Sequence, residues 1–184
     1  MQVSYNWLKS YIDFSYSPEE LSNKLTMAGL EVEEMEYLGE GLEDIIIGEI
    51  EEIKDHPNAD KLVICIVNIG KEKLQIITGA PNVKEGKKVP VAKSGVNLPN
   101  GMKIEESELR GKKSSGMICS EDELALVDER QDGIMILDDD YKVANNFVDE
   151  YGLNDYIYKL DLTPNYSRCL GMLGIAREIK ALLN

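Results

Sequence analysis

The chain has 184 residues, of which 43% are hydrophobic, so it is long enough for one ordinary domain or two small ones. Its formal net charge of −14 argues against a nucleic-acid partner, because affinity for nucleic acid depends largely on Lys and Arg side chains that neutralise phosphates. No apolar run approaches the ~20 residues that span a bilayer, and the N-terminus lacks the layout of a signal peptide, so a cytoplasmic protein without a membrane partner is predicted.

The first elements are predicted to be two short helices. Aromatic and aliphatic residues recur at intervals of three and four over residues 3–14, which predicts one helix. Ser17 and Pro18 then form an N-cap and a first helical turn, and Leu21, Leu25 and Ala28 give the second helix an apolar stripe. Gly29 is predicted to end that helix in the left-handed conformation.

Residues 30–38 predict a half-exposed, acidic strand that ends in a glycine-containing turn, and this is the first candidate domain boundary. Residues 45–53 are rich in isoleucine and predict a strand, followed by a loop at residues 56–60. Residues 61–70 and 74–78 together predict a β-hairpin.

The middle of the chain predicts short strands separated by tight turns. We expect strands near residues 88–92, 103–104, 107–109 and 114–119. Ser120 and Glu123 form a capping-box pattern, which predicts a short helix from Ser120. Residues 134–137 predict a buried strand.

The C-terminal part predicts a helix over residues 143–151, a strand over 156–162 and a loop over 163–168. Apolar residues over 170–183 follow the period of an amphipathic helix. The sequence contains nothing after this helix to cover its apolar face, and this favours a fragment of a longer protein.

The charge is distributed unevenly. Residues 1–60 carry 3 basic and 15 acidic side chains, and residues 114–161 carry 3 basic and 13 acidic ones. Residues 71–113 reverse this balance with 10 basic and 5 acidic side chains. A basic surface in an acidic protein is typical of a nucleic-acid contact, although a solvated lysine face is the alternative.

Several separated motifs follow one another along the chain. They are Tyr5-Asn6-Trp7-Leu8-Lys9, Ala28-Gly29-Leu30-Glu31-Val32-Glu33, His56-Pro57-Asn58-Ala59-Asp60-Lys61-Leu62, Gly79-Ala80-Pro81-Asn82-Val83, Leu109-Arg110-Gly111, Ser115-Gly116-Met117-Ile118-Cys119-Ser120-Glu121, Thr163-Pro164-Asn165 and Met172-Leu173-Gly174-Ile175-Ala176-Arg177-Glu178. In this order, the motifs resemble the N-terminal portion of bacterial phenylalanyl-tRNA synthetase beta subunits. The sequence departs from the usual pattern of that family at Tyr166-Ser167-Arg168.

The resemblance implies an α+β fold in which an OB-fold β-barrel is inserted into a small, discontinuous, helix-turn-helix-like helical domain. Residues 39–150 would form the OB-fold tRNA-binding module. Residues 1–38 and 151–184 would form the host, and the final helix would lead into the body of a larger subunit. The bare residue pattern agrees, since the first helices lack a core and the last helix lacks a cover.

The resemblance also implies a function. The chain would be a tRNA-binding or scaffold segment of an enzyme that attaches phenylalanine to tRNA, as the beta subunit of an alpha2-beta2 complex. The parent enzyme uses ATP and magnesium, but this segment is expected to hold no cofactor, no metal and no catalytic residue. DNA is an unlikely partner, because likeness to a helix-turn-helix fold is weak evidence for DNA binding.

Cationic and small polar residues of the basic region and its flanks are the candidate tRNA contacts. Lys61, Lys93, Arg110, Lys112 and Lys113 are candidates for phosphates, and Asn82 and Ser115 are candidate neutral hydrogen-bonding partners. Residues 71–120 contain no Phe, Trp or Tyr, so stacking of bases on aromatic rings is excluded there. Binding is therefore predicted to be weak, dominated by backbone phosphates and sensitive to salt.

Other reactive residue types are predicted to be structural. His56, the single histidine, is expected to belong to a fixed turn with Pro57, and Ser120 with Glu121 to cap a helix. Met117 and Cys119 are expected inside the barrel, and all three cysteines to be buried, since no C-x-x-C pair is present.

Three alternatives stay open. The segment could act purely as a scaffold between subunits, a reading that the net charge favours. It could be a free-standing OB-fold tRNA-binding protein. An enzyme built on a cysteine and His56 is the third, but no orienting residue is evident for such a pair.

Overall fold

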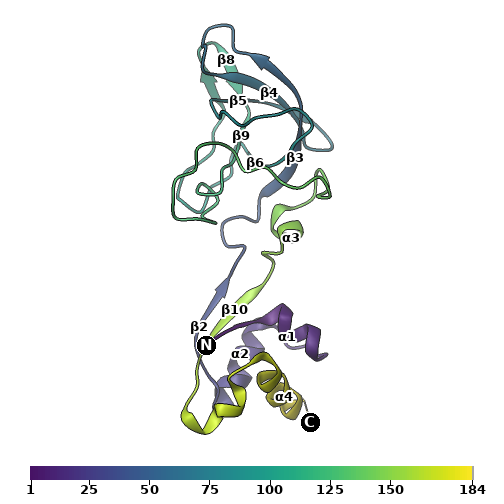
Figure 1. Cartoon of the computed structure of the whole chain (residues 1–184), viewed down its shortest axis with the longest axis vertical. Coiled ribbons are helices and arrows are strands. Elements are labelled where there is room, and N and C mark those ends of the chain that lie inside the picture. Colours follow the sequence, from purple (N-terminus) through teal and green to yellow (C-terminus); the bar gives the residue numbers. More distant parts are fainter. Residues whose placement is uncertain (184) are drawn as a thin grey trace. The chain divides into compact units, whose positions relative to one another are not determined.

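The described residues, 1–183, form two compact units in the computed structural model (Figure 1). One unit combines Met1–Leu38 with the chain from Leu153 onward, and the other is Gly39–Gly152. Each unit buries its own apolar cluster. The α+β fold class is confirmed, and we refer to the two units as the host unit and the barrel unit.

Five antiparallel strands build the barrel unit in the order β5-β4-β3-β6-β9. They are β3 (Ile45–Asp55), β4 (Val63–Asn68), β5 (Lys73–Thr78), β6 (Lys88–Lys93) and β9 (Gly116–Ile118). The long strand β3 pairs with β6 through Ile45–Glu49 and with β4 through Glu49–Asp55, with a register shift between Ile50 and Glu52. Such an irregularity bends a strand and lets it serve two partners in a small barrel.

Strand β5, the first of this order, is joined to residues 113–115, which directly precede the last strand β9, by a seam of three hydrogen bonds. The Ser115 backbone N–H donates to the Gln75 carbonyl at 2.9 Å, and Gln75 Nε2 donates to the Lys113 carbonyl at 2.7 Å. The Ile77 backbone N–H donates to Ser114 Oγ at 3.1 Å. The barrel is therefore nearly closed, as the predicted OB fold requires.

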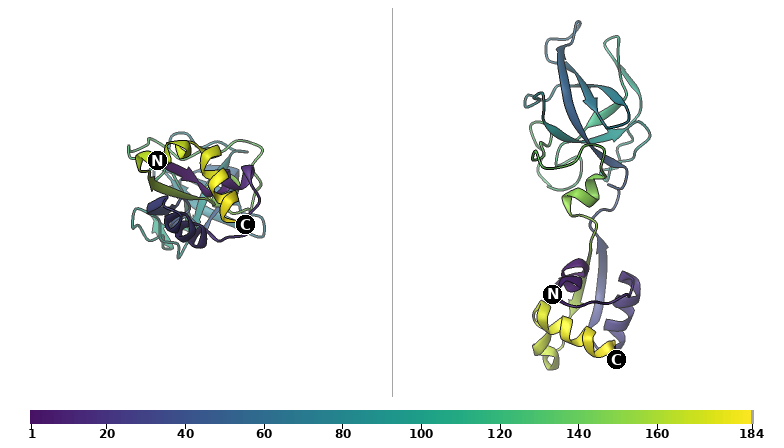
Figure 2. Two further views of the ribbon diagram at one scale, coloured as in Figure 1. Left: turned by 90° about the horizontal axis from the view of Figure 1, so that it is seen from below. Right: turned by 90° about the vertical axis from the view of Figure 1, so that its right-hand side faces the viewer.

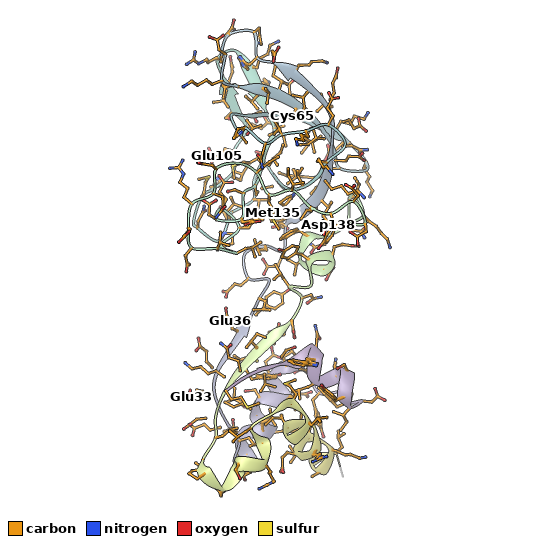
Figure 3. All side chains as sticks on the ribbon, in the orientation of Figure 1. Glu33, Glu36, Cys65, Glu105, Met135 and Asp138 are labelled. Atoms are coloured by element: carbon orange, nitrogen blue, oxygen red, sulfur yellow. The ribbon has the colours of Figure 1, made fainter. Side chains whose placement is uncertain are left out.

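Aliphatic side chains from both sides of the barrel fill its core, including Ile50, Val67, Ile76 and Val91, all at most 1% exposed. Cys65 lies inside the barrel, as Figure 3 shows. The prediction that Met117 lies inside the barrel was wrong. Ile118 belongs to this core instead, and Met117 is half-buried on the other face of β9. Strand residues alternate between faces, so Cys119 is buried outside the barrel cluster.

Two predicted strands of the barrel unit are not strands. Residues 103–104 make a single bridge, between Lys103 and Asn97. In the segment at 134–137, Ile134, Met135 and Leu137 are buried as predicted, but Ile136 is 40% exposed. The segment forms one bridge, from Leu137 to Lys88, and one further backbone bond, from Met135 to Cys119. A hairpin of β7 (Ser107–Leu109) and β8 (Lys112–Ser114) is present, and its second strand was not predicted.

The helix predicted from Ser120 is a single turn. The capping-box contacts exist, since the Ser120 backbone N–H donates to Glu123 Oε2 at 2.8 Å. Ala125, however, is left-handed with φ of 54°. The backbone N–H groups of Ala125 and Leu126 donate to the carbonyls of Asp122 and Glu121, the pairing of a Schellman helix end. The N-cap at Ser120 and the helix end at Ala125 are thus separated by a single turn.

The last helix of the barrel unit, α3 (Phe147–Tyr151), is shorter than the predicted 143–151. The Asn146 side chain accepts from the Asp149 backbone N–H and starts the helix there. Ala144 has φ of 71°, which the preceding turn requires and a helix excludes. Gly152, left-handed with φ of 80°, ends α3.

The host unit is not the helical domain that the resemblance implied, and it contains the two strands predicted near residues 30–38 and 156–162. It contains a three-stranded antiparallel sheet in the order β1-β10-β2, with helices gathered around it (Figure 2). Its elements are β1 (Gln2–Ser4), α1 (Tyr5–Tyr11), α2 (Pro18–Met27), β2 (Glu31–Tyr37), β10 (Tyr156–Asp161), the 3-10 helix η1 (Pro164–Cys169) and α4 (Met172–Leu182). Strand β1 and helix η1 were not predicted.

Helix α2 follows the sequence rules closely. Ser17 and Glu20 exchange both capping-box hydrogen bonds, and Gly29 is left-handed with φ of 88°, as predicted. Beside this glycine, the Tyr166 hydroxyl donates to the Ala28 carbonyl at 2.7 Å. The host unit thereby ties η1 to the end of α2.

The core of the host unit is formed by all of its sheet and helical elements. Leu8, Leu21 and Ile175 are fully buried, and the Tyr158 ring is buried with its hydroxyl donating to the Pro18 carbonyl at 2.8 Å. Figure 3 labels Glu33 and Glu36 on β2, which are exposed. The acidic strand therefore has one solvated face, as predicted.

All three cysteines are buried, as predicted, and we expect them to be unreactive in the native protein. Burial raises the pKa of Cys65 to about 11 and that of Cys119 to about 12, and Glu123 adds to the second shift. Because the thiolate is the reactive form, a disulfide reagent at pH 8 should modify the urea-unfolded chain but not the native one. Rapid labelling of native Cys65 or Cys119 would contradict this burial.

The same shifts predict a stability change at alkaline pH. The folded pKa values lie above the ordinary value of about 9, so the folded state holds these protons more tightly. Stability should be independent of the thiols below pH ~9 and fall as the pH rises from about 9 to about 12. Urea titrations across that range measure the fall, with Cys119→Ala as the comparison.

Candidate nucleic-acid interface

The structure divides the basic residues into paired and unpaired groups. Several lysines of residues 71–113 form ion pairs with nearby carboxylates, and these are Lys73 with Glu51, Lys87 with Asp139, Lys93 with Glu72 and Lys103 with Glu105. Lys88 donates to the backbone carbonyls of Asp139 and Tyr141. The candidate Lys93, 2.7 Å from Glu72, therefore has part of its charge neutralised.

The other four cationic candidates form no ion pair within residues 1–183, and all four are exposed. Lys61 ends the 56–61 loop, Arg110 lies in the β7–β8 turn, and Lys112 and Lys113 lie on β8. We call these four residues the basic tip. Lys71 and Lys84 are also unpaired but lie in other loops.

The β7–β8 turn holds Arg110 in an uncommon backbone conformation. Arg110 and Gly111 have φ of 49° and 86°, so the two-residue turn has positive φ at both positions, as type I′ hairpins require. Asn58 holds this turn from the neighbouring loop. Its Nδ2 donates to the Arg110 carbonyl at 3.0 Å, and Arg110 Nη1 donates back to the Asn58 carbonyl at 3.3 Å.

His56 also links the loop that contains Asn58 to the β7–β8 hairpin. Its side chain is buried, and its Nδ1 accepts from the Asn58 backbone N–H at 3.2 Å. The proton therefore lies on Nε2, which donates to the Leu109 carbonyl at 3.0 Å. His56 fixes a turn, as predicted, and positions the loop that carries Lys61 against the hairpin that carries Arg110.

The two neutral candidates have mainly structural contacts. The Asn82 amide bridges to the backbone of Ile134 in both directions, accepting at 2.9 Å and donating at 2.8 Å. Gly133 leaves room for it, because a Cβ there would lie 2.4 Å from Asn82 Oδ1. The backbone of Ser115 belongs to the barrel seam next to Lys113. The structure thus groups Ser115 with the basic tip, while Asn82 is bonded to Ile134.

A groove of about 310 Å³ begins beside the basic tip. Its apolar lining includes Leu62 and Leu109, the direct neighbours of Lys61 and Arg110 in the chain. The backbone of Gly79 approaches here as well, since a Cβ on it would lie 3.4 Å from the Lys61 carbonyl oxygen. The other lining residues are Ile77, Thr78, Gly79, Ala80, Met117, Ile118, Ser120, Asp122, Glu123, Arg130, Gln131, Gly133 and Ile134.

The polar side of this groove is organised by Ser120. Its hydroxyl donates to Asp122 Oδ1 at 2.7 Å, and its backbone N–H donates to Glu123 Oε2. The Gln131 backbone N–H donates to the same Asp122 oxygen at 3.2 Å. The Ser120 hydroxyl is the main reason that the pKa of Asp122 is lowered, so this carboxylate is ionised at neutral pH.

Sequence reasoning did not find Asp122, Glu123 or Arg130 as site residues. Ser120 and Glu121 were noted as part of a motif, but Arg130 lies beyond it in a stretch without periodicity. In the described part of the chain no cluster of three His, Cys, Asp or Glu side chains is arranged around a metal position. No helix found there has both the length and the apolar character needed to cross a membrane.

Comparison with known proteins gives two findings. A family model described as a putative tRNA binding domain matches residues 45–146. The phenylalanine–tRNA ligase beta subunit of Geobacter metallireducens is 50% identical over 183 residues, which is 100% of this chain and 23% of that protein. The corresponding subunit of Syntrophotalea carbinolica is 46% identical over 182 residues, 99% of this chain and 22% of that protein. The chain thus spans less than a quarter of these relatives.

Proposed function

This chain belongs to the putative tRNA binding domain family, and we propose that its barrel unit contacts tRNA phosphates through the basic tip. The observation that supports this site is the sorting of charges: Lys61, Arg110, Lys112 and Lys113 are exposed and unpaired, on two segments that bond to each other. Lys93 and Asn82, which were also candidates, would contribute less, because each is already bonded within the protein.

We further propose that the chain acts within a phenylalanine–tRNA ligase as part of its beta subunit, in company with an alpha subunit. The likeness to beta subunits along nearly the whole chain supports this. Such an enzyme joins phenylalanine to tRNA with ATP and magnesium in the cytoplasm. The proposal places ATP, magnesium and catalysis elsewhere in the complex.

Binding of tRNA at two salt concentrations tests the phosphate contacts. Four contacts predict an affinity that falls roughly 50- to 150-fold between about 50 and 200 mM monovalent salt. The double variant Arg110→Ala/Lys112→Ala should lower the slope of log affinity against log salt by about 2. Fluorescence anisotropy of labelled tRNA measures both values.

The matched control removes two paired lysines from the same basic region, as Lys73→Ala/Lys103→Ala. It lowers the net charge equally, so an equal loss in both variants would show general electrostatic attraction and would contradict the basic tip. Absence of binding at about 50 mM salt would instead favour the alternative function, a scaffold between subunits.

A further inference from the structure

The groove beside the basic tip is not used by phosphate contacts. Its lining includes the apolar side chains of Leu62, Leu109 and Met117 and the carboxylates of Asp122 and Glu123. Its volume of about 310 Å³ lies at the small end of the range for ligand pockets. A groove of this volume can hold one planar base.

We propose that this groove receives one unpaired guanine of the bound RNA, whose Watson–Crick edge donates hydrogen bonds to Asp122 and Glu123. This inference rests on the proposed function, because the RNA must first be held at the basic tip. It adds a preference for one base to a binding mode that would otherwise depend on charge alone.

The carboxylates are positioned to accept hydrogen bonds from a ligand. Ser120 orients both of them, through its hydroxyl on Asp122 and its backbone N–H on Glu123. Asp122 uses Oδ1 and Glu123 uses Oε2 in these bonds, so each keeps a second oxygen for another donor. An ionised carboxylate only accepts, and it therefore selects a base edge that offers donors.

Guanine fits this requirement better than the other bases. Its Watson–Crick edge carries two adjacent donors, the ring N1–H and the exocyclic amino group. Adenine and cytosine place one amino group next to an acceptor nitrogen, and uracil places one N–H between two carbonyls. The two carboxylates form fewer hydrogen bonds with these edges and are repelled by the neighbouring lone pairs.

The faces of the base would lie against the aliphatic wall. The barrel unit has no aromatic residue over 71–120, but flipped bases are also held between apolar side chains. Met117, half-buried on β9, has a polarizable thioether that packs well on an aromatic ring.

Cations of the basic tip, together with Arg130 in the groove, would neutralise the phosphates on either side of the inserted base. Leu62 and Leu109 connect the groove to Lys61 and Arg110 of the basic tip, and Arg130 lines the groove itself. Arg130 forms no ion pair among residues 1–183. A strand that inserts one base therefore meets positive charge near its backbone, which offsets the repulsion from the two carboxylates.

Short RNAs that differ at one base test the inference. Single-stranded hexamers with G, A, C or U at one position are titrated against the wild type at about 50 mM salt. We expect the G-containing hexamer to bind about tenfold or more tightly than the U-containing one. The isosteric double variant Asp122→Asn/Glu123→Gln should lose this preference and keep the salt dependence, since the basic tip is unchanged.

Two further variants separate base recognition from folding. Glu121→Gln is the matched control, because it removes one carboxylate from the same turn without altering the groove lining, and it should keep the preference. Met117→Ala removes part of the wall and should weaken all four hexamers while preserving their order.

The outcomes distinguish the two proposals. Salt-dependent binding of all hexamers with equal affinity, or a preference that survives Asp122→Asn/Glu123→Gln, would overturn the guanine site and leave the phosphate contacts standing. No binding of tRNA or of any hexamer would overturn both. Melting curves of each variant confirm that the barrel unit is folded when the binding is measured.

Discussion

Phe147→Ala is expected to destabilise the barrel unit by about 3–5 kcal/mol, the usual cost of removing a large buried ring. Phe147 is fully buried at the start of α3, and its ring stacks on Tyr151 with centroids 5.0 Å apart. Helix α3 has five residues, too few to be stable alone, so it depends on this packing against β3. The loss should therefore reach the barrel and not only the helix.

Hydrogen exchange read by mass spectrometry measures this effect separately for peptides of 39–152. Tyr151→Ala is the control, because Tyr151 lies on the same helix and is 39% exposed. It should cost much less than Phe147→Ala. Equal losses would show that α3 matters through its own stability rather than through the buried ring.

Gly174→Ala is expected to destabilise the host unit by about 3 kcal/mol, at the upper end of the usual cost of overpacking. A Cβ on Gly174 would lie 2.1 Å from the Arg168 carbonyl oxygen and 2.9 Å from Cys169 Cα. Both are backbone atoms of η1, so no side chain can rotate away. Helix α4 would have to separate from η1, which carries the buried Cys169.

Trp7 fluorescence during urea unfolding reports this change, because Trp7 is the only tryptophan of the chain and belongs to the host unit. Gly171→Ala is the matched control, three residues earlier, where an added Cβ meets no atom within 4 Å. Similar midpoints for Gly174→Ala and the wild type would show that η1 moves at little cost.

The sequence predicted elements whose signals are local. The N-cap at Ser17 and the hairpin of β4 and β5 were both predicted correctly, since short-range contacts decide them. The capping box at Ser120 misled because Ala125, with no glycine to mark it, adopts a left-handed conformation. Strand β1 was missed because three residues carry no periodicity, and its pairing with β10 joins distant parts of the chain.

The candidate site was only partly visible in the sequence. The excess of basic over acidic residues in 71–113 could be counted in the sequence. The sequence does not show which of these lysines form ion pairs with carboxylates. Lys93 meets Glu72 only because a folded barrel brings them together. Asn82 bonds to Ile134, 52 positions away, and Arg130 reaches the groove of Asp122 through an irregular loop. Such contacts depend on tertiary structure, which no local pattern encodes.

The seam is the part of the barrel where transient local opening is expected to be easiest. Strands β4 and β5 share a ladder of six residue pairs, whereas the seam has three hydrogen bonds, two of which use side chains. Fewer bonds must break at once there, so transient opening of the seam has a lower free energy than separation of any long ladder. Lys113 belongs to the seam and Lys112 precedes it on β8. Under the proposed function, opening of the seam would let these two cations adjust to an uneven phosphate backbone while the long ladders stay paired, and Gln75→Ala, which removes one seam bond, would make such opening more frequent.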